Sequence, residues 1–142
     1  MYVFEKIANT VMPYRDNLII SLETAADFLN LSNGGLYKSD IQAYSPIEQN
    51  IPGFIITVQP DCFKIKQYEE RHGIFSTTPE QTLLDLLENE EDIDIQTLLE
   101  SLSNYYYKHH ESFNGLEDQM NSKQQQAFEK WKQDAIDYYT ED

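Results

Sequence analysis

The chain has 142 residues, a hydrophobic fraction of 40% and one cysteine, so it suits one folded domain and excludes an intramolecular disulfide framework. Its formal net charge of −15, from 25 acidic and 10 basic residues, argues against direct binding of nucleic acid, which depends on Lys and Arg. No apolar run is long enough to cross a bilayer and no cleavable signal is present, so we expect a cytoplasmic protein without membrane contact.

Near the N-terminus, the pattern predicts a helix, a short buried strand and a second helix. The first helix ends at Pro13 and carries apolar residues at helical spacing, namely Val3, Phe4, Ile7 and Val11. Residues 17–20 form the strand, and Ser21 caps a helix that runs to residues 29–31. The glycines at positions 34 and 35 then supply the left-handed conformation that ends this helix.

Three further strands are expected in the middle of the chain, at residues 41–44, 54–58 and 62–66. Residues 54–58 are almost all apolar, as in a strand that is buried on both faces. Residues 62–66 alternate in polarity and follow a Pro-Asp turn, which predicts a hairpin with the preceding strand. With residues 73–75 as a further strand, we expect an α+β fold: a small antiparallel sheet packed with several helices, and a helical C-terminal half.

Residues 76–87 are the most fully specified element of the chain. Thr78 stands at a helix N-cap position, Pro79 at the first helical position, and Gln81 at the spacing of a capping box. Four leucines then predict a helix that is buried on most of its circumference: Leu83, Leu84, Leu86 and Leu87. We expect the strand, cap and helix to be a folding centre rather than a catalytic site.

Residues 73–87 resemble the hallmark of the type IV toxin–antitoxin antitoxins, the abortive-infection antitoxin family. In that family a short strand leads into a Thr/Ser-Pro-Glu-Arg-Thr-Leu-x-Asp-Leu-Leu helix start, and here Gln81 stands where Arg is usual. Residues 18–32 are similar to another recurring piece, a strand that enters a small-residue helix, and residues 52–58 to the strand between them. The match covers residues 18–87, which is roughly half of the chain.

This resemblance implies an antitoxin domain that neutralises a nucleotidyltransferase-like toxin. The family's antitoxins also carry a winged-helix DNA-binding domain ahead of the matching region, whereas about 17 residues precede it here. We therefore expect the antitoxin-like C-terminal domain without the winged helix, and no repression of an operon by this chain alone.

The second half of the chain is predicted to be helical. Within one domain over residues 1–142, residues 1–90 would form the antitoxin-like core and residues 91–142 an acidic, Tyr-rich helical extension. Asp94 caps a helix with an apolar stripe, and residues 113–115 break the pattern. A last helix over residues 122–139 carries Phe128, Trp131, Ala135 and Tyr138 at helical spacing.

The acidic residues are concentrated in this half. Residues 1–75 carry nine acids and six bases, a net of −3, whereas residues 76–142 carry sixteen acids and four bases, a net of −12. Such charge steers a protein toward a basic partner; the alternative is that it only keeps a small protein in solution. We assign contact with the basic nucleotide or RNA site of a toxin to six carboxylates: Glu88, Glu90, Glu91, Asp92, Glu117 and Asp118.

No motif predicts a metal, a cofactor or catalysis. The acids between residues 88 and 94 lack the glycine and final glutamate of an EF-hand, and His109 and His110 would point about 100° apart on a helix. Cys62 with His72 invites a nucleophilic mechanism, but a small buried thiol is the simpler interpretation. We expect a protein that is not an enzyme.

Three hypotheses about function stay open. The first is a non-enzymatic, antitoxin-like inhibitor that neutralises a cognate nucleotidyltransferase-type toxin. The second is a phage-encoded acidic mimic of nucleic acid that inhibits a host-defence nuclease, of the anti-CRISPR or anti-restriction type. The third is a scaffold domain that assembles through its Tyr-rich helices. The oligomeric state does not follow from the residues.

Overall fold

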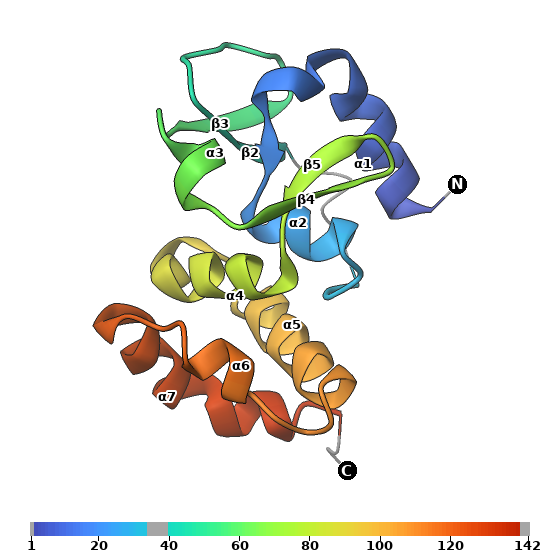
Figure 1. Ribbon diagram of the computed structural model, residues 1–142. Helices are drawn as coiled ribbons and strands as arrows, with labels where there is room; N and C mark the ends of the chain where they lie inside the picture. The colour runs from blue at the N-terminus through green and yellow to red at the C-terminus, as the bar shows by residue number, and fades with distance from the viewer. Residues whose placement is uncertain (1, 34–39, 140–142) are drawn as a thin grey trace.

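The structure of the protein, a computed structural model, describes residues 2–33 and 40–139 (Figure 1). These residues form a five-stranded sheet with the order β3-β2-β1-β5-β4. The strands are β1 (Ile19–Ile20), β2 (Ile41–Ser45), β3 (Phe54–Val58), β4 (Tyr68–Arg71) and β5 (Ile74–Thr77). The helices are α1 (Val3–Val11), α2 (Leu22–Phe28), α3 (Cys62–Ile65), α4 (Pro79–Glu88), α5 (Ile95–Lys108), α6 (Asn114–Glu117) and α7 (Ser122–Ile136), with the 3₁₀ helices η1 (Met12–Asn17) and η3 (Glu90–Asp92).

The sheet is mixed, so the expectation of an antiparallel sheet is wrong. Strand β1 is antiparallel to β2 but parallel to β5, and β2 is parallel to β3. Strands β4 and β5 form an antiparallel hairpin. The parallel pairing has a physical reason: β1 and β5 each lead into a helix, α2 and α4, and these two helices pack against each other. Two strands whose helices start at one edge of a sheet must run in the same direction.

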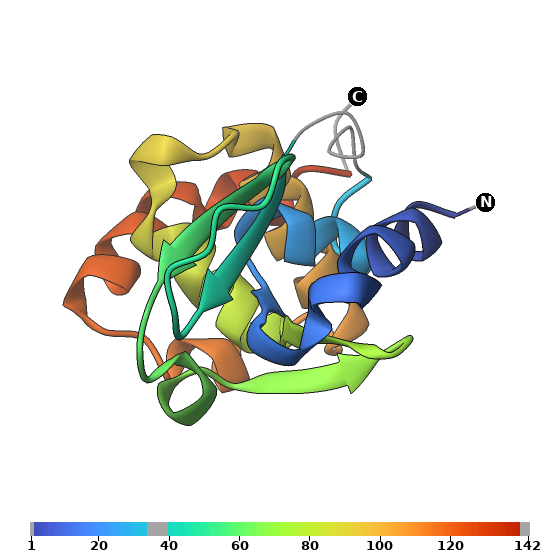
Figure 2. The same ribbon diagram turned by 90° about the horizontal axis from the view of Figure 1, so that it is seen from above.

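The two faces of the sheet are covered unequally. Helices α1 and α2 contribute to the main core together with Ile20, Ala43 and Ile74 on one face. On the other face a smaller cluster joins Ile19 and Tyr44 to Cys62 of the short helix α3. Figure 2 shows α1 and α3 on opposite sides of the sheet.

Residues 62–66 do not form the predicted strand. Residues 62–65 are the helical turn α3, in which the Ile65 amide donates to the Asp61 carbonyl at 2.9 Å. The turn inserts the Cys62 side chain under the sheet, where it is fully buried, and leaves Ile65 65% exposed. The predicted hairpin of residues 54–58 with residues 62–66 is therefore absent. A hairpin forms between β4 and β5, where His72 and Gly73 connect the strands with φ values of +53° and +83°. Such left-handed pairs suit tight hairpin turns.

Strand β3 is not buried on both faces, contrary to expectation. It is the last strand in the order, and the side chains of Ile55 and Val58 are 52% and 45% exposed. An apolar run therefore marks an edge strand here, because among the described residues no further strand follows β3 in the sheet.

Helix α2 ends earlier than predicted. Its last residue is Phe28, and Asn30 adopts φ +60° while the Leu31 amide donates to the Ala26 carbonyl at 2.8 Å. Asparagine thus takes the left-handed position that commonly ends a helix. The glycines at 34 and 35, which were expected to do so, lie outside the described residues.

Helix α4 confirms the strongest prediction, with one change at its start. The Thr78 hydroxyl accepts from the Gln81 amide at 3.2 Å, and the four leucines are at most 6% exposed. The Gln81 side chain does not reach back to Thr78, since it accepts from the Gln67 amide at 3.2 Å and donates to Asp85 at 2.9 Å. The Thr78 amide donates instead to the Gln67 carbonyl at 3.1 Å.

Helices α4 to α7 form a layer below the sheet in Figure 1, and we call residues 79–136 the helical layer. Its centre is Phe128 of α7, which is fully buried, while Trp131 is partly buried. Asp94 caps α5 as predicted, and its carboxylate accepts from the Gln96 amide at 3.1 Å. Where residues 113–115 were expected to break the pattern, the chain forms the single turn α6. No helix of the described residues is long and apolar enough to cross a membrane.

Candidate protein-binding site

Two of the six predicted binding carboxylates are engaged within the chain. Glu88 accepts from Asn121 Nδ2 at 3.1 Å and lies 3.5 Å from Lys123 Nζ. Glu90 accepts from the indole N–H of Trp131 at 2.7 Å and from Lys130 Nζ at 3.1 Å. These contacts attach the end of α4 and η3 to α7, so Glu88 and Glu90 stabilise the helical layer.

The environment of Glu90 favours its charged form. The hydrogen bond from Trp131 outweighs the cost of burial and, with Lys130, holds the pKa of the Glu90 carboxyl below its usual value. Its side chain is only 17% exposed, so little of this charge is presented to a partner.

The neighbouring acids Glu91 and Asp92 are exposed. Among the described residues, no Lys, Arg or His forms an ion pair with either one. Asp94 follows at the start of α5, and its amide donates to the Glu23 carboxylate of α2 at 2.6 Å. The connection from α4 to α5 therefore presents unneutralised carboxylates, which we call the acidic turn (Glu91, Asp92 and Asp94).

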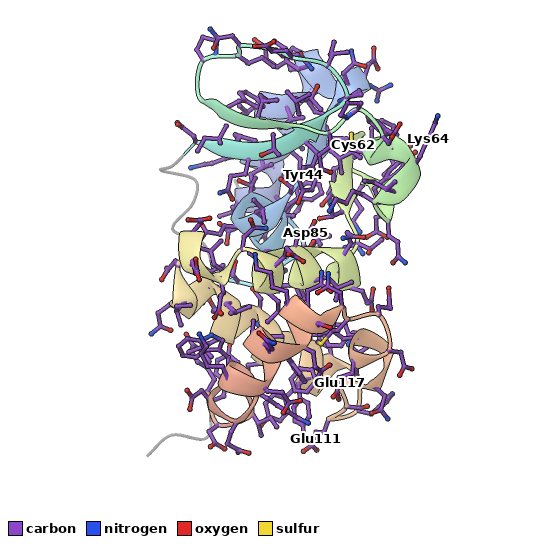
Figure 3. All side chains as sticks on the ribbon, turned by 90° about the vertical axis from the view of Figure 1, so that its left-hand side faces the viewer. Tyr44, Cys62, Lys64, Asp85, Glu111 and Glu117 are labelled. Atoms are coloured by element: carbon purple, nitrogen blue, oxygen red, sulfur yellow. The ribbon has the colours of Figure 1, made fainter. Side chains whose placement is uncertain are left out.

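Glu117 and Asp118 lie at the end of α6, away from the acidic turn. Figure 3 shows Glu117 on the opposite flank of the helical layer from the connection between α4 and α5. Asp118 is exposed and Glu117 is partly buried, and neither forms an ion pair with a described residue. The structure thus brings residues 88–92 together and separates Glu117 and Asp118 from them.

A buried polar network, absent from the sequence-based prediction, lies between the sheet and the helical layer. Asp85 of α4 accepts from Tyr44 of β2 at 2.8 Å, from Lys66 Nζ at 3.0 Å and from Gln81 at 2.9 Å. Asp85 and Tyr44 are each 3% exposed, and the Lys66 ammonium also lies 4.9 Å from the centre of the Tyr44 ring. Figure 3 shows Tyr44 above Asp85, with Cys62 beside Tyr44.

This network holds the chain together rather than presenting a reactive group. Burial, together with the charge of Asp85 and the hydrogen bond to it, raises the pKa of Tyr44, so the phenol stays a donor. Burial also raises the pKa of the Cys62 thiol, which disfavours a nucleophilic thiolate. The signal that could have revealed the network is Asp85 itself, a carboxylate within a run of buried leucines, because such a group requires partners.

The histidines considered for catalysis or metal binding have other contacts. The His72 ring stacks on Phe4 at 4.5 Å, on the sheet face opposite to Cys62, so the two do not form a pair. His109 stacks on Tyr105 with ring centres 3.8 Å apart at the end of α5. Within residues 2–33 and 40–139, no group of three or more His, Cys, Asp and Glu side chains could hold a metal ion.

A pocket of about 400 Å³ lies beside α1 and the turn that follows α2. It is lined by Tyr2, Val3, Phe4, Asp27, Asn30, Ser32 and Asn33. Asp27 accepts a short hydrogen bond from the Ser32 hydroxyl, which fastens the turn at the end of α2. The pocket offers aromatic and amide surface, with no pair of groups placed for acid–base chemistry among these residues.

The fold and these surfaces define a small acidic α+β protein with carboxylates on its helical layer. Comparison with protein-family models, with curated proteins and with solved structures gave no match. The resemblance to abortive-infection antitoxins therefore depends on the motifs in the sequence.

Proposed function

We propose that the protein is a non-enzymatic inhibitor of the antitoxin kind, which binds a basic protein, a toxin of the nucleotidyltransferase type. The observation that carries the proposal is that four of the six predicted binding carboxylates have no ion-pair partner among the described residues. These are Glu91, Asp92, Glu117 and Asp118. Two of the four bases in residues 76–142 are used on Glu88 and Glu90, which leaves the other four predicted carboxylates without a neutralising base among the described residues.

The charge acts first on the rate of association. A net charge of −12 over residues 76–142 attracts a positively charged surface over about a Debye length, which is about 8 Å at physiological ionic strength. A site that binds nucleotide or RNA phosphates presents such a surface, and carboxylates can take the place of phosphates there. Inhibition then consists of occupying the site.

The residues that carry the family resemblance also support the proposal. Residues 73–87 contain the expected strand, cap and buried helix, as β5 and α4. The departure at Gln81 has a structural role of its own, since Gln81 links Gln67 to Asp85. The resemblance therefore falls on the part of the chain that joins the sheet to the helical layer.

The experiment uses the full chain with an affinity tag, incubated with lysate of its source cells, and mass spectrometry of the captured proteins. We expect a basic nucleotidyltransferase that is eluted by salt and whose toxicity to growing cells is relieved by co-expression of the chain. The variant E91K/D92K/E117K/D118K should lose capture and rescue at equal expression.

A control reverses two acids at the other end of the molecule. Glu48 and Asp61 are exposed and lie outside the helical layer, so E48K/D61K should retain both capture and rescue. Equal rescue by the variant and wild type would contradict the proposal. Capture of a basic nuclease in place of the toxin would instead favour the mimic of nucleic acid.

A further inference from the structure

The outer edge of β3 carries main-chain groups without a strand to pair with. The Ile41 amide donates to the Gly53 carbonyl, and the Gln59 amide to the Ser45 carbonyl, each at 2.8 Å. Because main-chain groups alternate along a strand, residues 53, 55, 57 and 59 face β2. The N–H and C=O groups of residues 54, 56 and 58 therefore point away from β2, and no described strand pairs with them. The Phe54 amide donates to the Ile51 carbonyl at 3.1 Å in the turn before β3, so the open groups begin at the Phe54 carbonyl.

The side chains on this edge are apolar and exposed. Ile55 is 52% exposed, Val58 45%, and Ile47 in the preceding loop 52%. Proteins commonly protect an edge strand with a lysine, a proline, a bulge or a covering segment. Residues 54–58 contain neither lysine nor proline, and they pair with β2 residue by residue without a bulge.

The segment that contains β2 and β3 is also nearly free of charge. Between residues 41 and 60, Glu48 is the one charged residue of a chain with a net charge of −15. The helical layer, which carries most of that charge, lies at the opposite end of the molecule (Figure 1). Two like-charged copies can therefore approach at β3 with less repulsion than elsewhere.

We propose that the protein forms a dimer in which β3 pairs with β3 of a second copy, antiparallel about a two-fold axis. The arrangement that pairs the whole strand places Ile56 opposite the second copy's Ile56, and Phe54 opposite its Val58. These are hydrogen-bonded positions, since their main-chain groups point outward, and Phe54 contributes its carbonyl because its amide is bonded to Ile51. Ile55 then lies opposite the second copy's Thr57, and each copy covers the apolar edge of the other.

A second copy fits this edge better than the basic partner of the proposed function. A basic protein is attracted to the helical layer, whereas β3 offers it no carboxylate. Pairing of identical strands gives both copies the same environment, as a closed two-fold assembly requires, and it directs the two acidic layers away from each other. The inference does not depend on the proposed function.

The first test is the mass of the untagged full chain in solution, measured by sedimentation from about 1 to about 100 µM. We expect a reversible dimer, and we expect I55K and V58K to be monomeric, because a lysine on an edge strand opposes pairing. Both side chains are exposed in the monomer, so the variants should keep the far-UV spectrum and melting temperature of the single chain. The control I65K changes a still more exposed isoleucine on α3 and should remain a dimer.

The second test measures the register with cysteines. Proteins with I55C and with T57C are prepared separately and then mixed under mild oxidation. Residues 55 and 57 would be a directly opposed pair without main-chain hydrogen bonds to each other. The Cα atoms of such a pair lie about 4.5 Å apart, which suits a disulfide. We expect a cross-linked dimer of one I55C chain with one T57C chain, and little cross-linking in either protein alone; Cys62 is buried and does not interfere.

Three results would overturn the proposal. One is a monomer throughout the concentration range. Another is a dimer that survives I55K and V58K, and the third is cross-linking that is as fast within one variant as in the mixture. Loss of capture of another protein by I55K, with a monomeric wild type, would assign the edge to that protein instead.

Discussion

The sheet and the helical layer of this protein differ in how their surfaces could contact other molecules. Residues 1–75, which form most of the sheet, carry a net charge of −3, and an apolar edge is exposed at β3. Residues 76–142 carry −12, and their large apolar side chains, such as Phe128 and Leu102, are mostly buried. One end thus favours short-range pairing and the other long-range attraction, and helix α4 connects them.

The largest effect is expected where the two regions meet. D85A removes the carboxylate that accepts from Tyr44, Lys66 and Gln81. The buried Tyr44 hydroxyl and the Lys66 ammonium then lose their acceptor. We expect the free energy of unfolding to fall by about 3 kcal/mol, because removal of one partner of a buried ion pair leaves the other uncompensated. Urea denaturation followed by far-UV circular dichroism measures the change.

D85N is the matched control for this prediction. It keeps an oxygen that can accept from Tyr44 but removes the charge that attracts Lys66. We expect the free energy of unfolding of D85N to lie between the values of wild type and D85A. If D85A were as stable as wild type, the network would not be what joins the sheet to α4.

The next effect concerns the attachment of η3 to α7 and depends on pH. E90Q keeps an acceptor for the Trp131 indole but removes the charge, and we expect a loss of about 1.5 kcal/mol at pH 7. The pKa of Glu90 is lowered on folding from an ordinary value of 4.5. Its contribution is therefore complete above about pH 4.5 and disappears as the pH falls through the lowered folded value.

Thermal melts of E90Q and wild type from about pH 7 to about pH 3 measure this dependence. The two melting temperatures should converge at the acidic end. Trp131 fluorescence reports the contact directly, since the indole donates to Glu90 only while η3 is attached. A difference that stayed constant over the range would mean that the charge of Glu90 contributes nothing.

A smaller effect is expected at the N-cap of α4. T78A removes the hydroxyl that accepts from the Gln81 amide, and a lost cap costs about 1 kcal/mol. T78S keeps the oxygen and should restore most of the stability. Urea midpoints of the three proteins give the comparison, and equal loss in T78S and T78A would show that the methyl group matters instead.

The features that the sequence predicted correctly are local. Thr78 and Pro79 start α4, Asp94 starts α5, and the leucines of α4 are buried, because capping and helical periodicity act over a few residues. The position of a strand in the sheet is not local. The apolar run of β3 has the same composition as a central strand, and its place at the edge follows from the strand order, in which it pairs with β2 on one side and with no described strand on the other.

For the candidate site too, the sequence predicted local features and missed contacts between distant residues. The carboxylates were chosen from charge alone, and Glu91 and Asp92 are exposed, as contact with a partner requires. The hydrogen bond from Trp131 to Glu90 was not predictable from the sequence, because 41 residues separate the two along the chain. Asp85 was overlooked because its partners Tyr44 and Lys66 lie 41 and 19 residues away.

The smallest expected effect on stability is the sharpest test of the difference between engaged and exposed acids. E91K/D92K changes two exposed carboxylates next to Glu90, and we expect the free energy of unfolding to stay within about 0.5 kcal/mol of wild type. Reversal relieves repulsion within a region of net −12, so any change at low salt should be a gain that salt removes. E88Q/E90Q, in the residues just before this pair, should lose stability, since both carboxylates bond to α7. Urea denaturation at two salt concentrations compares the two variants. A loss of stability in E91K/D92K as large as in E88Q/E90Q would mean that Glu91 and Asp92 stabilise the helical layer and are not a surface left open for a partner.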